Sequence, residues 1–536
     1  MVRIGLATAL ALVLGVAGFV AAQTGAALKP PEGSLTIAYH TFFKEVVDPG
    51  VHSTLGVPYH GHMFDPLIGT APDGQLSAAR GLATSWATSD NGQTWTLKLR
   101  PNVKWHDGKP FTADDVVFTL GERFQAKDAA CTFCGPVKRV VQEVKAVDPL
   151  TVQIRLKKPD ITFFALLSSR DGDLVMLPRH GYRAKGDGFE QIEPPIGTGP
   201  WKFVERKLGD SITYEVNRAY WDPTRVPEFA RLRVVLRPDP ASRLAALRAG
   251  EVDMATVDPA QVRQVKSAGL KLMGPKVVAL PVLAFHASFD PQFLTNKLEF
   301  RKALVLAVDM DAIYKRVYGG AEEFATRASN AGFWSPAALG YDPSLKPYPY
   351  QPDEAKRLLK QVNYDGRPLK VWSFQAGNAS EVPELLELIA GYWTAAGLKV
   401  ELTPIEFGAF RVRYISDPHK FESGYAGHFA VDVGFPRPMM LSNLVVAHAS
   451  HKAGGPIQAF HDLGFMDGTL DKLQAIRDLK ELDGALREVN RRLHAEYSNY
   501  PLVYRDVIFA TGPRVAGWSP GNYGVALNME TVKRAR

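Results

Sequence analysis

The stretch that decides the fold of this chain runs from Asp90 to Phe124 and reads DNGQTWTLKLRPNVKWHDGKPFTADDVVFTLGERF. Residues 93–99 alternate apolar and polar side chains, the period-2 pattern of a β-strand with one buried face. The Asp-Asn-Gly run before them predicts a turn, since Asn and Gly tolerate the left-handed backbone of a tight reversal. Residues 103–106 predict a second short strand, and an Asp-Gly turn follows it.

A helix is expected to begin after Thr112. The Thr112 hydroxyl can accept a hydrogen bond from a free backbone N–H at the helix start. The next residues include Asp114 and Asp115, whose negative charges favour the positive end of a helix. The expected buried stripe of this helix consists of Val116, Val117 and Leu120.

Part of this stretch, KLRPNVKWHDGKPFTADDVVFTL, resembles the signature of the family 5 extracellular solute-binding proteins of ABC transporters. These are the peptide, nickel and opine receptors of the bacterial periplasm. Further motifs of the family follow in order along the chain, among them LATSW at 82–86, PIGTGPW at 195–201, ALRAGEVDM at 246–254 and FRKALVLAVD at 300–309. The resemblance therefore extends over most of the chain.

The resemblance implies a two-lobe α/β fold of the class II periplasmic binding protein type, with a hinge between the lobes and an extra subdomain in lobe I. Lobe I is expected over 23–284, with the extra subdomain at 66–195. Lobe II is expected over 285–500, and 501–536 would return to lobe I. The ligand would be enclosed when the lobes close about the hinge.

The residue patterns agree with α/β lobes. A chain of 536 residues exceeds what one hydrophobic core usually serves, so at least two domains are expected. Strand, helix and strand patterns follow one another over 231–254, where Asp239-Pro240 marks the helix start. The same order recurs over 370–404. Each unit predicts parallel strands with a right-handed crossover.

Composition excludes several classes of protein. Apolar residues make up 46% of the chain and charged residues 22%, which is ordinary for a globular protein. The net charge is +7, but the basic residues are dispersed along the chain. A nucleic-acid partner is not expected, because such binding needs a concentrated basic patch with interleaved aromatic residues.

The N-terminal residues predict a signal peptide at 1–22. Arg3 is followed by an apolar run over 4–20, and small residues precede Gln23. The alternative is an uncleaved anchor, because a run of this length could just span a bilayer. The residue after the expected cleavage site is Gln23 and not Cys, so we expect a free periplasmic protein and not a lipoprotein. We also expect a monomer.

The chain has two cysteines, Cys131 and Cys134, in the order Cys-Thr-Phe-Cys. They are candidates for a short-loop disulfide in an oxidising compartment. The alternative is a pair of free thiols. One pair cannot build a four-thiolate zinc site.

No motif predicts catalysis. The chain lacks G-x-S-x-G, H-E-x-x-H and a phosphate-binding loop with Lys-Ser/Thr. We therefore expect no enzyme activity, no cofactor and no resident metal. The alternative of another class is a secreted metal-dependent hydrolase that uses the N-terminal histidines His40, His52, His60 and His62, which otherwise are surface or core residues.

The family resemblance also suggests where a ligand binds. Peptide-binding relatives have a Trp-x-x-Asp-x-x-x-Pro stretch in the cleft, whose Asp meets the ligand's amino group. Here the corresponding residues are 429–436, in which Asp432 and Pro436 keep the spacing and Phe429 replaces the Trp. A second acid of the family pattern is also missing, at Phe435. The open alternatives are that Asp432 caps a turn or pairs with Arg413 or Arg437.

Further binding residues are expected around Asp432. Arg413 and Arg437, together with Arg411, are candidates for binding a ligand carboxylate or are surface residues. Tyr425, His428 and Phe429 are expected on the wall of the cleft, because such clefts are mostly apolar with few polar groups.

These observations predict a periplasmic receptor that captures a peptide or peptide-like amine and delivers it to the permease of an ABC importer. The alternatives within the same role are an opine, an oligosaccharide, nickel or haem as the ligand.

Overall fold

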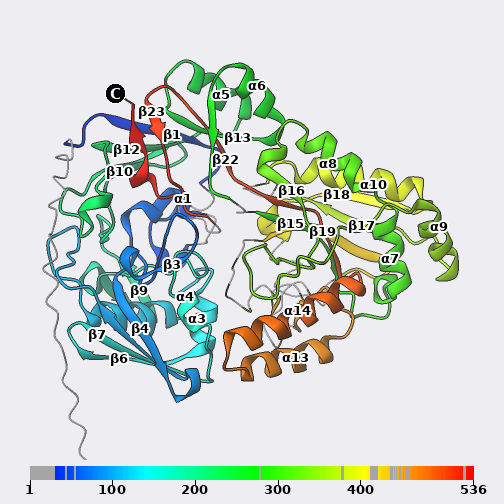
Figure 1. Cartoon of the computed structure of the whole chain (residues 1–536), viewed down its shortest axis with the longest axis horizontal. Helices are drawn as coiled ribbons and strands as arrows, with labels where there is room; N and C mark the ends of the chain where they lie inside the picture. Colours follow the sequence, from blue (N-terminus) through cyan, green and yellow to red (C-terminus); the bar gives the residue numbers. More distant parts are fainter. Residues whose placement is uncertain are drawn as a thin grey trace, which may run out of the picture.

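The structure is a computed structural model that describes residues 30–42, 45–52, 56–276, 279–375, 379–410, 421–434, 437, 439, 441, 444, 445, 448–450, 452, 458–522 and 527–535. Figure 1 shows two lobes side by side, with the N-terminal half of the chain in one and the yellow and orange part in the other. Each lobe is built on its own β-sheet.

The sheet of lobe I has seven strands and combines the start, middle and end of the chain. In spatial order the strands are β10 (Trp201–Lys207), β11 (Ser211–Val216), β12 (Arg231–Leu236), β1 (Ser34–Tyr39), β13 (Met254–Val257), β22 (Ile508–Thr511) and β14 (Lys271–Met273). The first strand, β1, pairs in parallel with β12 and β13. The late strand β22 lies antiparallel between β13 and β14.

The strand–helix–strand unit expected over 231–254 is present. Helix α5 (Pro240–Arg248) joins β12 to β13, and β1 lies between those two strands. The Asp239 carboxylate accepts a hydrogen bond from the backbone N–H of Ser242 at 2.7 Å, which caps the helix as the Asp-Pro pair predicts. Helix α6 (Val262–Ser267) follows and leads into β14.

The extra subdomain of lobe I is built on an antiparallel sheet in the order β4, β5, β7, β6. Its elements include β2 (Gly69–Thr70), β3 (Leu76–Ser77), β4 (Ala83–Ser89), β5 (Thr94–Leu99), α2 (Ala113–Val116), α3 (Cys134–Val140), β6 (Val141–Asp148), β7 (Thr151–Leu156), α4 (Phe163–Leu166), β8 (Tyr182–Lys185) and β9 (Gly188–Gln191). All of them fall between residues 69 and 191.

The stretch from Asp90 to Phe124 forms most of what its sequence predicts. Asn91 has a positive φ of 55° in the turn, and the strand after it is β5. Thr112 and Asp115 form a capping box at the start of α2. The second short strand expected at 103–106 is wrong: this segment makes a single bridge, from Lys104 to Pro110, because the chain turns back at once.

Asp115 connects this stretch to its surroundings. Its side chain is 6% exposed and accepts hydrogen bonds from the Trp105 indole at 3.1 Å, the Thr112 N–H at 3.0 Å and the Arg179 N–H at 3.1 Å. One buried carboxylate therefore holds a turn, a helix start and the segment before β8 together.

The sheet of lobe II has five strands. In spatial order they are β18 (Val400–Pro404), β17 (Leu369–Ser373), β19 (Gly427–Gly434), β15 (Leu280–His286) and β20 (Asn499–Pro501). The described helices are α7 (Leu298–Leu306), α8 (Met310–Tyr318), α9 (Pro352–Gln361), α10 (Val382–Ala395), α11 (Phe407–Phe410), α13 (Leu463–Ala475) and α14 (Leu479–Ala495).

Helix α10 covers one face of this sheet. It joins the parallel strands β17 and β18, which is the second strand–helix–strand unit expected from the sequence. Leu385, Ile389 and Trp393 recur at helical spacing, are each 0% exposed and pack against apolar residues of β17 and β19.

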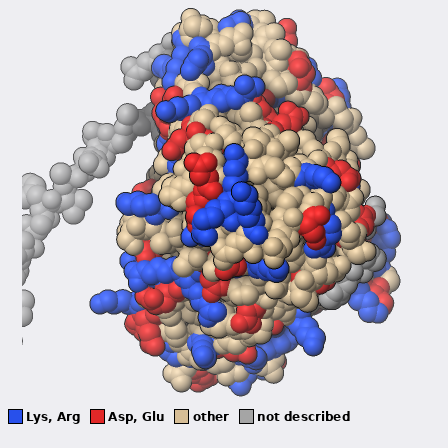
Figure 2. Space-filling model, turned by 90° about the vertical axis from the view of Figure 1, so that its right-hand side faces the viewer, with Lys and Arg blue, Asp and Glu red and all other residues tan. Residues whose placement is uncertain are grey.

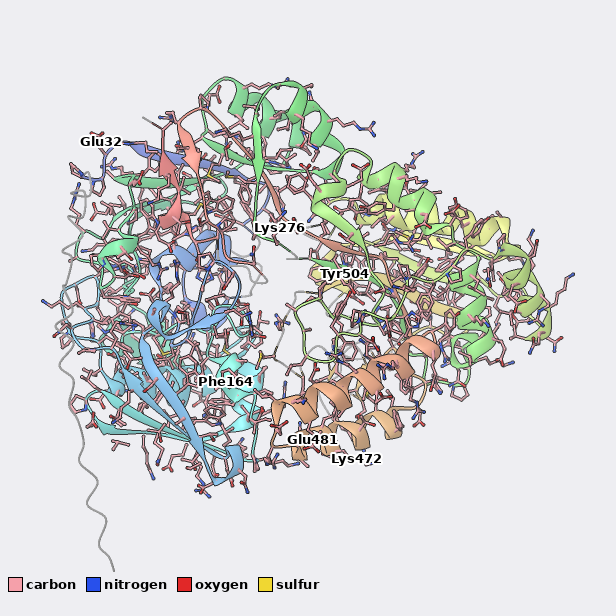
Figure 3. All side chains as sticks on the ribbon, viewed as in Figure 1. Glu32, Phe164, Lys276, Lys472, Glu481 and Tyr504 are labelled. Carbon is pink, nitrogen blue, oxygen red and sulfur yellow. A yellow bond between two sulfur atoms is a disulfide. The ribbon has the colours of Figure 1, made fainter. Side chains whose placement is uncertain are left out.

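Helices α13 and α14 pack on each other around a smaller apolar cluster of lobe II. Ile161 of the extra subdomain packs against this cluster. Figure 3 labels residues near this edge: Phe164, three residues further along the chain, and Lys472 and Glu481 on the two helices. The lobes therefore touch at this edge as well as at the hinge.

Two chain crossings join the lobes. The first leads from β14 to β15, and the second leads from β21 (Val503–Arg505) to β22. They run antiparallel and are bonded to each other: Ala279 and Arg505 exchange two backbone hydrogen bonds, at 3.0 and 2.9 Å. The Lys276 ammonium and the Asp506 carboxylate, 2.7 Å apart, add an ion pair between them; Figure 3 labels Lys276 and, on β21, Tyr504.

The crossings lie at other residues than the lobe boundaries expected from the sequence. The expected start of lobe II at residue 285 falls inside β15, which begins at Leu280. The expected return at residue 501 falls in β20, and β22, the first strand back in lobe I, begins at Ile508. Both crossings carry apolar residues on each side, so hydrophobicity alone does not mark where a strand changes sheet.

The surface of lobe II mixes both signs of charge. Figure 2 shows Lys and Arg side chains interspersed with Asp and Glu on the face that it presents. Among the described residues, no helix combines the length and the apolar character needed to cross a membrane.

We predict that replacing Asp115 with Ala destabilises lobe I by about 3 kcal/mol, because the buried Trp105 indole and two partly buried backbone N–H groups lose their acceptor. Urea unfolding followed by tryptophan fluorescence measures the change. The matched control is Asp114→Ala, which removes an exposed acid from the same helix start. Equal effects of the two substitutions would contradict the role given to Asp115.

Candidate functional site

Strand β19 divides the predicted binding residues between two faces of the lobe II sheet. Phe429 and Val431 point toward α10 and belong to the main core of the lobe. His428, Ala430 and Asp432 point to the opposite face, because successive side chains of a strand alternate. The alternation therefore separates Phe429 from Asp432.

Asp432 lies at the hinge end of lobe II. It is opposite Val282 in the antiparallel pair of β19 and β15, and Gly434 is opposite Leu280, the first residue of β15 after the crossing. The Asp432 residue is 7% exposed. A largely buried carboxylate thus stands next to the place where the chain passes between the lobes.

The side chain next to the Asp432 carboxylate in the described structure is His286 of β15. The His286 Nε2 atom lies 3.2 Å from the Asp432 Oδ2 atom, without the alignment of a hydrogen bond. The two side chains approach each other over the small pair Ala284 and Ala430, which are opposite each other in the sheet. Among the described residues, no Lys or Arg forms an ion pair with Asp432.

Two alternatives for Asp432 were a cap on a turn and an ion pair with Arg413 or Arg437. It belongs to a strand and does not cap a turn. Arg437 has other neighbours: its guanidinium lies 4.6 Å from the ring centroid of Phe133 in lobe I. Arg411, Arg413, Phe435 and Pro436 lie outside the described residues.

Arg437 and Met439 contact lobe I. Burial lowers the pKa of Arg437, and the nearby carboxylates of Asp173 and Asp171 oppose this change. Two residues further on, the backbone N–H of Met439 donates to Asp171 Oδ1 at 2.8 Å. Two described residues that follow the Asp432 strand, Arg437 and Met439, thus contact lobe I.

The loop of lobe I that Arg437 contacts contains the disulfide expected from the sequence. Cys131 and Cys134 are joined in the structure, and Phe133 lies between them in the sequence. The loop is fixed to the N-terminal segment of lobe I, since the Ala130 N–H donates to the Gly50 carbonyl at 3.0 Å and the Thr132 N–H to the His52 carbonyl at 3.3 Å.

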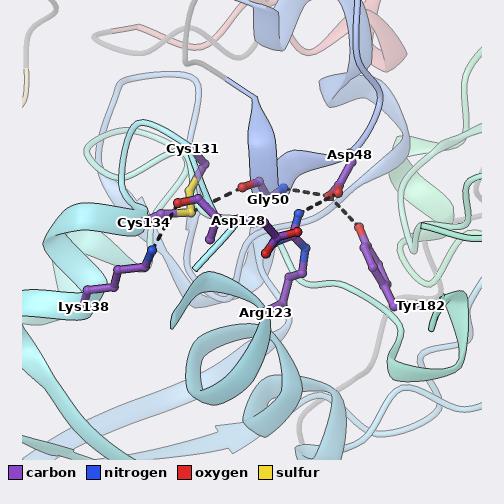
Figure 4. Close-up of a disulfide and its surroundings, with 9 residues drawn as sticks. Asp48, Gly50, Arg123, Asp128, Cys131, Cys134, Lys138 and Tyr182 are labelled. Atoms are coloured by element: carbon purple, nitrogen blue, oxygen red, sulfur yellow. Dashed lines mark hydrogen bonds and ion pairs between the residues drawn. A yellow bond between two sulfur atoms is a disulfide. The ribbon is translucent and has the colours of Figure 1, made fainter. Parts of the chain in front are cut away.

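Figure 4 shows a buried ion pair beside this disulfide. The Arg123 side chain is 0% exposed, and its guanidinium donates to Asp48 Oδ2 at 2.8 Å. The Tyr182 hydroxyl and the Gly50 N–H donate to the other Asp48 oxygen, each at 2.8 Å. A buried charge pair needs such additional hydrogen bonds to offset its lost hydration.

Phe429 does not lie on a cleft wall. Its side chain is 0% exposed, with ring centroids of Trp393 and Phe285 at 5.1 and 5.5 Å. A ligand would have to displace α10 to reach this ring. The position fits core packing, which a lone aromatic residue in a sequence motif cannot reveal.

Tyr425 and His428 lie at the end of β19 that is away from the crossings. The Tyr425 hydroxyl donates to Glu401 Oε2 at 2.9 Å, and Lys370 pairs with the same carboxylate. His428 is 0% exposed, and its Nε2 atom lies 3.0 Å from the Glu422 carbonyl oxygen. Neither side chain contacts Asp432 directly in the described structure.

The N-terminal histidines are largely buried in lobe I. His52, His60 and His62 are 3%, 4% and 8% exposed, and the rings of His52 and His60 are 3.8 Å apart between centroids. Among the described residues, no group of three or more His, Cys, Asp or Glu side chains is placed to hold a metal ion.

Two lobes with separate sheets, two crossing segments and buried polar groups beside the crossings define a hinged binding protein. A model described as bacterial extracellular solute-binding proteins, family 5, matches residues 78–435. The chain belongs to this family.

Relatives in this family have different ligands in their names. The chain is 28% identical over 385 residues to the dipeptide-binding protein of Escherichia coli (strain K12), covering 68% of this chain and 69% of the relative. It is 27% identical over 464 residues to heme-binding protein A of Haemophilus influenzae, covering 83% and 82%.

Solved structures share the fold. NikA from Brucella suis in complex with Fe(III)-EDTA has a TM-score of 0.78 at 22% identity, covering 94% of this chain and 100% of that one. DppA from Helicobacter pylori in complex with the peptide STSA has a TM-score of 0.76 at 22% identity, covering 94% and 98%.

We predict that Phe429→Ala lowers the free energy of unfolding by about 3–5 kcal/mol, because it leaves a cavity between Trp393 and Phe285. Phe429→Leu should cost less and leave a folded protein for binding assays. Urea unfolding measures both, with Tyr425→Phe as the control at a more exposed position. Loss of binding in Phe429→Leu at unchanged stability would sink the core assignment.

We predict that acid destabilises the protein through its buried histidines. Burial lowers the pKa of His428 to about 4 and of His448 to about 3, below the unfolded value of 6.5. The unfolded state then binds more protons, so stability falls as the pH drops below 6.5 toward these folded values. Each group contributes up to about 1.4 kcal/mol per pH unit.

Urea unfolding at pH 7.5, 6.0 and 5.0 measures this dependence. The variant His428→Gln should show a shallower loss than the original protein over the same range. NMR that finds His428 protonated with a pKa near 6.5 in the folded protein would contradict the prediction.

Proposed function

We propose that this protein is a periplasmic receptor of an ABC importer, and that it captures a peptide or a peptide-like amine between its lobes. The family supports the receptor role, and its relatives include proteins named for dipeptides, di/tripeptides, nickel, haem and glutathione. We choose an amine because the carboxylate of Asp432 is largely buried at the hinge end of lobe II.

A buried carboxylate needs compensation for its lost hydration, and a cation with hydrogen-bond donors supplies it best. Asp432 has no Lys or Arg ion-pair partner among the described residues. His286 lies next to Asp432 in the described structure, but the two side chains are not aligned for a hydrogen bond. A ligand ammonium, with three N–H donors, would complete this site.

The proposed working cycle is a closure of the lobes about the paired crossings. The ligand would contact lobe II through Asp432 and lobe I on the other side, so that it binds the closed form more tightly than the open form. A ligand shifts a two-state equilibrium only through such differential affinity. The closed form would then dock on the permease.

Export through a signal peptide at 1–22 and a monomeric state remain predictions, and the first of these falls outside the described residues. The positions of the two crossings support a lobe I that comprises residues 30–276 and the residues from Ile508 onward. We infer that this division, in place of 285 and 500, forms the moving units.

We predict that di- to pentapeptides raise the thermal unfolding midpoint of the purified protein, since a ligand that binds only the folded state stabilises it. Asp432→Asn should reduce the affinity for the best peptide about 10- to 100-fold, because a charge-assisted hydrogen bond becomes a neutral one. The control is Asp471→Asn, which changes an exposed acid on α13.

Opines, neutral oligosaccharides, haem and Ni²⁺ serve as competing probes in the same assay. A shift with a neutral sugar and none with peptides or amines would overturn the choice of ligand. Mass spectrometry of small molecules that co-purify with the exported protein gives an independent identification.

A further inference from the structure

His286, the last residue of β15, is a buried polar side chain to which the proposed binding cycle gives no role. It is 0% exposed, and neither ring nitrogen makes a hydrogen bond with a described residue. The Asp432 Oδ2 atom, 3.2 Å from the His286 Nε2 atom, is buried without a hydrogen bond as well. Buried polar atoms without hydrogen bonds are rare and costly, so two such groups in contact need an explanation.

The sheet of lobe II brings these two side chains together. In the antiparallel pair of β15 and β19, His286 is opposite His428, and Asp432 lies four residues further along β19. The residues between them on the same face are Ala284 and Ala430, which are small and opposite each other. The register and the two small residues therefore let the imidazole reach the carboxylate.

Apolar rings surround the His286 side chain. The ring centroids of Phe410 on α11 and of Phe421 each lie 5.7 Å from that of His286. Neither ring offers the strong hydrogen-bond acceptor that an imidazolium needs. Among the described side chains around it, the Asp432 carboxylate is therefore the group that can pair with a charged His286.

The other titratable groups near this face are engaged elsewhere. The His428 Nε2 atom lies 3.0 Å from a backbone carbonyl oxygen, and burial lowers the pKa of this residue to about 4. Lys370 of β17, whose charge acts on His428, pairs with Glu401. His448 contacts Asn499 of β20, and burial lowers its pKa to about 3. The described base next to Asp432 is thus His286.

We propose that His286 is a positioning residue that controls how much of the Asp432 charge a ligand amine can use. When the imidazole is neutral, Asp432 lacks a cation and takes the ammonium of the solute. When the imidazole is protonated, His286 is itself the cation, and a small turn of the ring gives Asp432 a charge-assisted hydrogen bond. The proposal rests on the proposed function, because the solute's amine is taken to bind Asp432.

The amine and a proton therefore compete for one carboxylate. Binding of the ammonium to Asp432 sends the Nε2 proton of His286 to the solvent, and protonation of His286 expels the ammonium. By linkage, each of the two weakens the binding of the other by the same factor. Capture is strongest at neutral pH and weaker in acid, since an imidazole ordinarily changes its charge between pH 5 and 8.

Isothermal titration calorimetry with alanyl-phenylalanine at pH 7.5 and 5.5 tests this competition. The original protein should lose affinity about 10-fold on acidification, whereas His286→Gln should change little. The solute cannot cause this loss. Its α-amino group, with an ordinary pKa of about 7.7–8.0, becomes more protonated over this range, and its carboxylate stays ionised.

The matched protein control is His180→Gln, which removes the imidazole that lies 2.9 Å from Asp107 in the extra subdomain. It should lose affinity in acid as the original does. The matched solute is N-acetyl-alanyl-phenylalanine, which has no amine and should show no such loss. Tryptophan fluorescence at each pH checks that the proteins are folded. An equal loss in the original and in His286→Gln overturns the proposal.

A second measurement uses the original protein alone, so it does not depend on the folding of His286→Gln. Calorimetry at pH 6.0 in two buffers of different ionisation enthalpy counts the protons released on binding. Alanyl-phenylalanine should release protons and its N-acetyl form should release none. The imidazole ¹⁵N resonances of His286 should show the loss of the imidazolium at the same time. Binding without proton release, or with no change at His286, overturns the proposal.

The proposal and the proposed function fail separately. If Asp432→Asn weakens binding at pH 7.5 while acid acts equally on the original and on His286→Gln, the amine site stands and the role of His286 falls. If alanyl-phenylalanine does not bind, or binds Asp432→Asn as tightly as the original, the amine site falls and the competition falls with it.

One readout needs no solute. At pH 6.0 the imidazolium fraction of His286 should be larger in the original protein than in Asp432→Asn, because an opposite charge nearby favours the charged form. Equal fractions overturn the coupling of the two residues, whatever the solute is.

Discussion

The pairing of the two crossing segments is the constraint on which the rest of this structure depends. Because Ala279 and Arg505 exchange backbone hydrogen bonds, the crossings form one short ladder rather than two independent linkers. The ion pair of Lys276 with Asp506 adds a second tie. Two crossings that are bonded to each other restrict the relative motion of the lobes more than a single linker would. Asp432 lies beside the first crossing, because Gly434 of its strand is opposite Leu280.

Single buried polar groups organise each lobe around that hinge. Asp115 holds the signature stretch of the extra subdomain, Asp65 gathers three donors in lobe I, and Asp48 pairs with Arg123 beside the disulfide. Each accepts a hydrogen bond from at least one residue that is distant in the sequence, Arg179 for Asp115, Tyr220 for Asp65 and Arg123 for Asp48. Such groups select one arrangement of the chain, because any other arrangement leaves buried donors and acceptors unpaired.

Local signals in the sequence predicted the elements that depend on local physics. The capping box at Thr112, the Asp-Pro start of α5 and the helical spacing of α10 were all readable, because each involves residues within a few positions of one another. The strand expected at 103–106 was wrong, since a strand needs a partner along its length and this segment has one bridge. The observed crossings differ from the expected lobe boundaries because apolar residues lie on both sides of each crossing. Hydrophobicity therefore does not mark the residue at which the chain changes sheet.

The candidate site was less accessible from the sequence. Spacing pointed to Asp432 but could not separate it from Phe429, which the alternation of β19 turns into the core. His286 shares no motif with Asp432, and the two side chains meet only because β15 and β19 pair in the sheet. This neighbour of Asp432 is a property of the assembled sheet, so no single stretch of sequence contains it.

The disulfide loop makes one contact between the two lobes depend on the oxidation state of Cys131 and Cys134. Phe133, between the bonded cysteines, receives the guanidinium of Arg437 from the other lobe. Disulfides persist in oxidising compartments and are reduced in the cytosol. Oxidising conditions therefore keep closed the loop on which Arg437 rests, and reduction of Cys131 and Cys134 would loosen this contact between the lobes.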